Sequence, residues 1–166
     1  CRMKERPLNI VVGSVLKDGK CLLIRRTKEP YKDYWSIPGG KLERGEDVQR
    51  AIERELKEEP GLGVKFAGLR GIVSEVLRDH KTNAVTAHFL IWVCGLEHVA
   101  GEAREQQEGS LGWFDARELE EQKQAVIPSD YLMLKRFLFG NIPSASLHTV
   151  HMRSTDSGYH IEHTDL

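Results

Sequence analysis

Three glutamates near the end of a predicted helix could together hold a divalent cation. Residues 46–59 contain no Pro or Gly and are rich in helix formers, so they predict a helix that stops at Pro60. On a helical wheel, Glu55, Glu58 and Glu59 fall within or beside the apolar stripe, and the remaining polar residues occupy the opposite face. The apolar stripe consists of Val48, Ala51, Ile52 and Leu56. We therefore expect the three acids at the boundary of the core.

The spacing of these acids suggests a reason for their presence. Carboxylates at positions i, i+3 and i+4 are neighbours on a helix, where like charges repel, and partial burial makes each ionised form more costly. A fold gains nothing from this arrangement, whereas a hard cation such as Mg²⁺ or Mn²⁺ prefers oxygen ligands and also takes up substrate phosphates. The spacing favours a metal site, and a solvated, Glu-rich helix edge is the alternative.

A glycine-rich turn precedes the helix. Gly39 and Gly40 carry no side chain, so backbone carbonyl or N–H groups can approach a ligand there. Glu46 lies at the helix N-terminus, where the helix dipole stabilises a carboxylate, and it could pair with Arg54 further along the helix. A loop of this kind beside a carboxylate-bearing helix predicts a diphosphate–metal site.

The arrangement of these residues resembles the signature of the Nudix hydrolases. Gly40, Glu46 and the run Arg54–Leu62 stand at the spacing of that signature, residues 35–40 resemble its usual lead-in, and a looser resemblance extends over residues 8–140. The resemblance implies an α/β fold, namely an α/β/α sandwich around a mixed β-sheet. It also implies hydrolysis of a nucleoside diphosphate linked to another group, with Mg²⁺ or Mn²⁺ as cofactor.

The resemblance further implies roles for individual residues. Glu55 matches a candidate general base, and Arg54 and Glu46 match the pair that orients the carboxylates. Catalysis is thus expected from Glu55, Glu58 and Arg54, with a carboxylate or the metal activating water for attack on phosphorus. Metal ligation is implied for Gly40 through its backbone carbonyl, and for Glu55, Glu58 and Glu59.

One residue departs from the family pattern. Pro60 stands where Thr usually precedes the glycine of the signature. Proline disfavours the α region for the preceding residue, Glu59, and it removes a backbone donor. The sequence therefore predicts either a displaced Glu59 or a helix that ends one residue early. It also leaves open a non-catalytic module that binds a nucleotide or a partner protein.

A polar stretch at residues 98–110 predicts a surface loop that could supply a further metal ligand. It contains Glu105 and Glu108, and the spacing favours Glu108. A loop whose acids are simply solvated is the alternative.

Several residues outside the helix are candidates for binding the substrate. Gly39, Lys41 and Arg26 could meet phosphate groups. Trp35 could stack on a base, although packing of its own loop is the better interpretation.

The substrate class is argued from missing features. The ADP-ribose hydrolases usually carry a proline beyond the signature, but no Pro occurs between Pro60 and Pro128. The diadenosine polyphosphate group usually carries a tyrosine there, but no Tyr occurs between Tyr34 and Tyr131. A (deoxy)nucleoside triphosphate, cleaved to a monophosphate and pyrophosphate, is the leading expectation. ADP-ribose or a nucleotide sugar is the alternative.

The elements that must position these residues follow from local patterns. Apolar runs at 8–16 and 21–24, joined through Asp18-Gly19, predict a hairpin, and residues 64–77 and 86–96 predict a second pair of strands. A short strand is expected at Trp113, a weak helix at 116–122, and a helix from an N-cap at Ser129 to residue 139. The order of strands and helices predicts a mixed sheet covered by helices.

Composition excludes several other classes. The chain has 166 residues, a net charge of −1 and no long apolar run, which disfavours a nucleic-acid polymer as ligand and a membrane span. Three scattered cysteines indicate reduced thiols and a cytoplasmic protein. The family resemblance implies that its partner is a small nucleotide.

The end of the chain differs in composition from the rest. Residues 1–142 are expected to form the catalytic domain, whereas 143–166 carry four of the seven histidines. The latter segment predicts a polar tail or an appended hairpin that turns at residues 155–158, and its histidine spacing matches no closed zinc pattern. Such a segment could contribute to a homodimer interface or extend a sheet edge.

Overall fold

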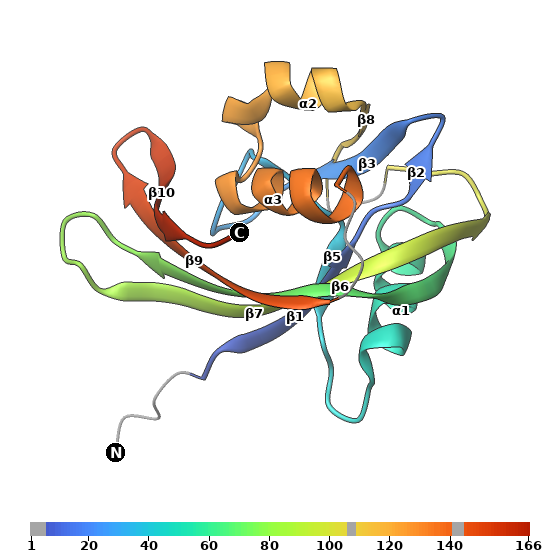
Figure 1. Cartoon of the computed structure of the whole chain (residues 1–166), viewed down its shortest axis with the longest axis horizontal. Coiled ribbons are helices and arrows are strands. Elements are labelled where there is room, and N and C mark those ends of the chain that lie inside the picture. The colour runs from blue at the N-terminus through green and yellow to red at the C-terminus, as the bar shows by residue number, and fades with distance from the viewer. Residues whose placement is uncertain (1–5, 106–108, 141–144) are drawn as a thin grey trace.

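The computed structural model describes residues 6–105, 109–140 and 145–166, which form two β-sheets with helices on both sides (Figure 1). The larger sheet has six strands in the order β10-β9-β6-β7-β1-β5. β1 is parallel to β7 and β6 is parallel to β9, whereas the other neighbours are antiparallel, so the sheet is mixed as predicted. Its strands are β1 (Leu8–Gly13), β5 (Gly39–Lys41), β6 (Gly63–Arg78), β7 (Val85–Ala100), β9 (Ser146–Thr155) and β10 (Gly158–Thr164).

The smaller sheet contains the predicted Asp-Gly hairpin. Asp18 and Gly19 have φ values of 52° and 75°, as the tight turn between two antiparallel strands requires. The first arm is shorter than predicted, because the chain leaves the larger sheet after Gly13 and only then enters the smaller one. The strands of this sheet are β2 (Leu16–Lys17), β3 (Lys20–Arg25), β4 (Trp35–Ser36) and β8 (Leu111–Phe114).

Side chains that alternate along β1 build a core on each face of the larger sheet. Val11 packs with α1 (Val48–Glu58), and the next residue, Val12, packs with α3 (Pro128–Met133) and the π-helical turn η2 (Leu134–Leu138). The remaining short helices, α2 (Ala116–Glu121) and η1 (Lys123–Ala125), lie on the α3 side (Figure 1). The layers are therefore helix, sheet and helix, which confirms the predicted α/β sandwich.

Two predicted boundaries were wrong. Ser129 is not an N-cap: the N-cap is Ile127, Pro128 occupies the first helical position, and Ser129 is fully buried. Proline suits that position because its fixed φ is already helical. The polar stretch 98–110 is also not all loop, since β7 continues to Ala100 by pairing with Gly63.

The segment after residue 144 forms a hairpin that extends the larger sheet. β9 pairs with β6 in parallel, and β10 returns antiparallel to β9 after a turn at residues 156–157. Among the described residues, no helix is long and apolar enough to cross a membrane.

Candidate active site

Helix α1 presents its carboxylates beside the larger sheet. Asp47 caps the helix by accepting the Arg50 N–H at 2.8 Å, and the apolar stripe is buried against β1, β5 and β6. Glu55 is largely covered, with a side-chain exposure of 13%, whereas that of Glu58 is 61%. The wheel thus predicted the position of Glu55 beside the core, and Glu58 lies further toward solvent.

Arg54 links the loop before the helix to the carboxylates on it. Its Nε and Nη2 donate to the two carboxylate oxygens of Glu46 at 2.8 and 3.0 Å, which confirms the predicted pair. Its Nη1 donates to Glu55 at 2.7 Å and to Glu58 at 3.2 Å, and Nη2 also donates to the Lys41 carbonyl at 3.1 Å.

This network changes the protonation chemistry of its members. The hydrogen bond from Arg54 holds the pKa of Glu46 below its usual range. The hydrogen bond to Glu46, followed by the interactions with Glu55 and Glu58, raises the pKa of Arg54. The guanidinium is therefore a fixed positive charge in contact with three carboxylates.

The two glycines of β5 provide space for this cluster. Gly39 and Gly40 pair with Val12 and Val11 of β1. A Cβ on Gly40 would fall on the carboxylate of Glu55, so only glycine lets that group approach the strand. The Gly39 N–H donates to Glu59 Oε2 at 3.4 Å. Turn and helix are thus in direct contact, as the sequence predicted.

Pro60 shortens the helix without moving Glu59 out of the helical region. The last helical residue is Glu58, and Glu59 is the C-cap with φ −78° and ψ −74°. The Glu59 N–H still donates to the Glu55 carbonyl at 2.9 Å. Of the two predicted effects, the structure shows the early end of the helix.

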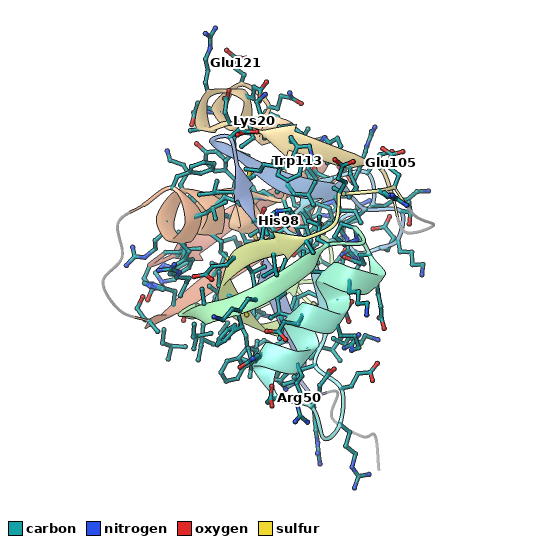
Figure 2. All side chains as sticks on the ribbon, turned by 90° about the vertical axis from the view of Figure 1, so that its right-hand side faces the viewer. Lys20, Arg50, His98, Glu105, Trp113 and Glu121 are labelled. Atoms are coloured by element: carbon teal, nitrogen blue, oxygen red, sulfur yellow. The ribbon has the colours of Figure 1, made fainter. Side chains whose placement is uncertain are left out.

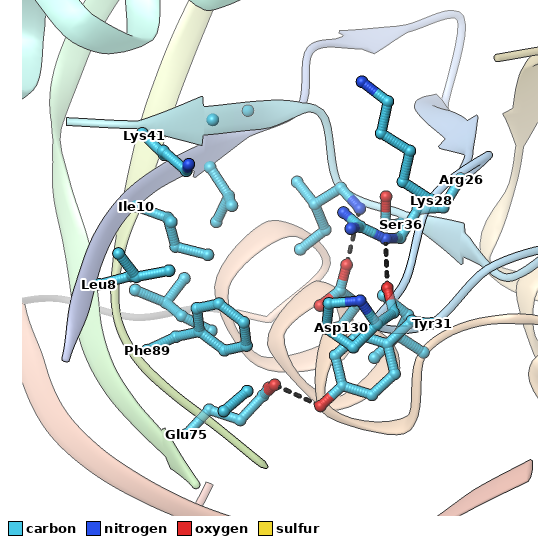
Figure 3. A pocket seen from close by; sticks show the side chains of 18 of the residues that line it. Leu8, Ile10, Arg26, Lys28, Tyr31, Ser36, Lys41, Glu75, Phe89 and Asp130 are labelled. Carbon is cyan, nitrogen blue, oxygen red and sulfur yellow. Dashed lines mark hydrogen bonds between the residues drawn. The ribbon is translucent and has the colours of Figure 1, made fainter. Parts of the chain in front are cut away.

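A pocket of about 1590 Å³ begins at this turn and extends between the two sheets (Figure 3). Figure 3 shows Leu8, Ile10 and Phe89 along one side, and Tyr31 and Asp130 across from them. The turn and the end of α1 also line the pocket, through Gly39, Gly40, Lys41 and Glu59.

The pocket has a buried acidic floor. Glu75 is 2% exposed, and the Tyr31 hydroxyl donates to its Oε1 at 2.7 Å. Asp130 accepts the Ile37 N–H through Oδ2 at 2.8 Å. Burial raises the pKa of Asp130 to about 7, and the charge of Glu75 adds to the rise. Burial also raises the pKa of Glu75, an effect that the Ser129 and Tyr31 hydroxyls only partly offset.

The structure brings some of the other predicted residues to this pocket and leaves others elsewhere. Arg26 lines the pocket with Gly39 and Lys41, and its Nε donates to the Pro30 carbonyl at 2.9 Å. Trp35 does not line it, because its ring packs edge-on against Phe114 with centroids 5.1 Å apart.

The expected additional metal ligand is not tested by the structure. Glu108 lies outside the described residues. Glu105 lies near Trp113 on the side of the smaller sheet (Figure 2), where its carboxylate accepts the Leu111 N–H at 3.1 Å.

Sequence reasoning missed the acidic floor, although one signal was present. Glu75 shares its strand face with Val73 and Leu77, both buried, so period-2 alternation already places this acid toward the core. Tyr31 and Asp130 carry no such signal. Tyr31 lies in irregular sequence, and Asp130 lies in the first turn of a short helix.

The fold and this site define a class of α/β sandwich proteins with a carboxylate-bearing helix beside a glycine turn, and the comparisons identify the family. The NUDIX domain model matches residues 7–137. An ADP-ribose pyrophosphatase of Methanocaldococcus jannaschii is 37% identical over 118 residues, 71% of this chain and 68% of the relative. The chain therefore belongs to the Nudix hydrolase family.

One further relative is named for a different activity, and one solved structure supports the fold. An 8-oxo-dGTP diphosphatase of Buchnera aphidicola is 39% identical over 57 residues, 34% of this chain and 44% of the relative. The crystal structure of a MutT protein from Bacillus halodurans superposes with a TM-score of 0.66 at 23% identity, covering 93% of this chain and 97% of that one, and it supports the fold alone.

Proposed function

We propose that this protein is a Mg²⁺-dependent hydrolase of the diphosphate linkage of a nucleotide, with a nucleoside triphosphate as leading substrate and a monophosphate and pyrophosphate as products. The observation that carries the proposal is the shared boundary of helix and pocket. Gly40 lies against the Glu55 carboxylate. Gly40 and Glu59 both line the pocket. A diphosphate bound at α1 would therefore place its nucleoside in the pocket.

The residues present fit a hard divalent cation in their chemistry. Glu55, Glu58, Glu59 and the Gly40 carbonyl offer only oxygen donors, which Mg²⁺ prefers, and the missing Cβ of Gly40 leaves room for the Glu55 carboxylate. In the described ranges, no three acidic, His or Cys side chains already converge on one point. We infer that these carboxylates would hold the cation, which would neutralise charge on the phosphates when bound.

Side chains of the protein would then supply the general base and the positive charge that binds the phosphates. Arg54 holds Glu55 against the turn, so an ionised Glu55 is placed to take a proton from the attacking water. Lys41 and Arg26 supply positive charge along the pocket for the phosphates. These roles rest on position and charge.

The electrostatics of the pocket orient the substrate. The floor carries the carboxyl groups of Glu75 and Asp130, whose oxygens can accept hydrogen bonds from the N–H donors on the edge of a base. Phe89 offers a ring on the apolar side, and stacking on an aromatic ring accommodates any base. We therefore place the base at the floor and the phosphates at the turn.

ADP-ribose is the second candidate. The 37% identical relative named as an ADP-ribose pyrophosphatase favours it. The pocket volume of about 1590 Å³ also exceeds the range of roughly 300–1,000 Å³ that is typical of small-molecule sites, which leaves room for a second sugar.

A product-resolved hydrolysis screen tests the proposal. Nucleoside triphosphates, an oxidised dGTP, ADP-ribose and a nucleotide sugar are incubated with Mg²⁺ and wild type, Glu58→Gln, or Glu43→Gln as the matched exposed control. We expect a monophosphate and pyrophosphate from a triphosphate, with activity abolished by EDTA and by Glu58→Gln only. Cleavage of ADP-ribose alone would select the second candidate. No cleavage by folded wild type, with nucleotide binding still seen by calorimetry, would refute both in favour of a binding module.

A further inference from the structure

The C-terminal hairpin contacts one wall of the pocket. β9 and β10 lie beyond residues 7–137, the range matched by the family model. The contact is made by Tyr159, the second residue of β10, which reaches the loop of residues 26–34. Six residues of that loop, 26–31, line the pocket.

Tyr159 touches this loop through its ring and through its hydroxyl. Its ring packs edge-on against Tyr31 and Tyr34, with centroids 4.6 and 5.6 Å apart. Its hydroxyl accepts the Tyr31 N–H at 3.5 Å and donates to Glu29 Oε2 at 3.5 Å. The adjoining turn fits closely as well, because a Cβ on Gly158 would fall on the Tyr34 hydroxyl.

The loop needs such support because its backbone is strained. Tyr31 and Asp33 have φ values of 67° and 69°, in the left-handed region that residues other than glycine rarely adopt. Such conformations persist where surrounding contacts hold them. Inside the loop, the Asp33 N–H donates to the Arg26 carbonyl at 2.9 Å. Tyr159 adds a contact from outside, directly at one of the two strained residues.

The position of Tyr31 in turn sets the floor of the pocket. Its ring is 4% exposed, and its hydroxyl donates to Glu75 at 2.7 Å. Glu75 Oε2 has no hydrogen-bond partner among the described residues, so the bond from Tyr31 to Oε1 is a main constraint on this buried carboxyl. A shift of Tyr31 would therefore change both the wall and the polar floor.

We propose that Tyr159 is a positioning residue for substrate binding, which acts by holding Tyr31 and the loop around it against Glu75. The C-terminal hairpin is then a part of the nucleotide pocket. The inference rests on the proposed function for its kinetic test. Tyr159 lies on β10, at the opposite edge of the larger sheet from β5, where Gly40 approaches Glu55. It should therefore affect the binding of substrate and leave the chemical step unchanged.

Three variants test this role. Tyr159→Ala removes the ring and the hydroxyl, Tyr159→Phe keeps the ring, and His160→Ala changes the exposed neighbour on the same strand. We expect Tyr159→Ala to raise KM about five- to tenfold with kcat within about twofold of wild type. Tyr159→Phe should restore most of the affinity, and His160→Ala should match wild type. If Tyr159→Ala does not fold, Tyr159→Leu takes its place, because it keeps apolar bulk without the ring.

Binding of mononucleotides separates this inference from the proposed function. Calorimetry with AMP, GMP and CMP in EDTA reports the pocket without hydrolysis or metal. A weaker Kd in Tyr159→Ala, with no cleavage by wild type, would keep the inference and refute the proposed function. An active wild type whose KM and Kd are unchanged in Tyr159→Ala, or a loss of kcat alone, would overturn the inference. A folded wild type that neither cleaves nor binds would overturn both.

Discussion

Replacing Asp130 with Asn should change how the stability of this protein depends on pH. Asp130 is buried at the pocket floor, where burial first and the charge of Glu75 second raise its pKa from 3.8 to about 7. Asn keeps an oxygen that can accept the Ile37 N–H, which is bound at 2.8 Å in the wild type. The substitution therefore removes the ionisation and preserves the hydrogen bond.

The sign and size of the effect follow from proton linkage. Between pH 4 and pH 7 the unfolded chain has released the proton of Asp130, and the folded chain keeps it. The wild type therefore loses about 1.4 kcal/mol of stability per pH unit, and the loss levels off above the folded-state pKa. Over the interval from 3.8 to about 7, the Asn variant should gain on the order of 4 kcal/mol relative to wild type.

Urea unfolding of both proteins at several pH values from 4 to 8 measures this gap. Asp18→Asn, at the exposed turn between β2 and β3, is the matched control, because Asn also suits a turn residue with φ of 52°. The control should run parallel to wild type. A gap between Asp130→Asn and wild type that stays constant within about 0.5 kcal/mol, or that shrinks as pH rises, would refute a protonated Asp130 in the folded state.

Three further outcomes are expected from the site. Gly40→Ala should lower kcat/KM at least about 100-fold, because the methyl group would displace the Glu55 carboxylate, and a urea midpoint far below that of wild type would instead indicate a folding defect. Arg54→Lys should lower kcat about tenfold or more with little change in KM. One ammonium group cannot reproduce the planar set of donors by which Arg54 holds Glu46 and Glu55. Steady-state kinetics that match wild type would contradict the orienting role. Phe89→Ala should raise KM about tenfold with kcat nearly unchanged, as loss of stacking predicts, and an unchanged KM would exclude this ring from the base site.

Local spacing was sufficient to predict the carboxylate helix and its immediate surroundings. The apolar stripe of α1 packs as the wheel predicted, and Glu46 pairs with Arg54. The Asp18-Gly19 turn is also as predicted. These features depend on residues within about two helical turns or one hairpin of each other, where periodicity and backbone preference decide the conformation.

The pocket depends instead on contacts between distant parts of the chain. Glu75 comes from β6, Tyr31 from an irregular loop and Asp130 from α3, and only the folded sheets bring them together. The docking of β9 beside β6 likewise places Tyr159 against Tyr31. By itself the sequence determined which side chains lie together on α1, because that grouping follows from residue spacing along one helix. The tertiary structure decided which residues form the pocket beside α1, because pairing and burial between remote segments follow no local sequence period.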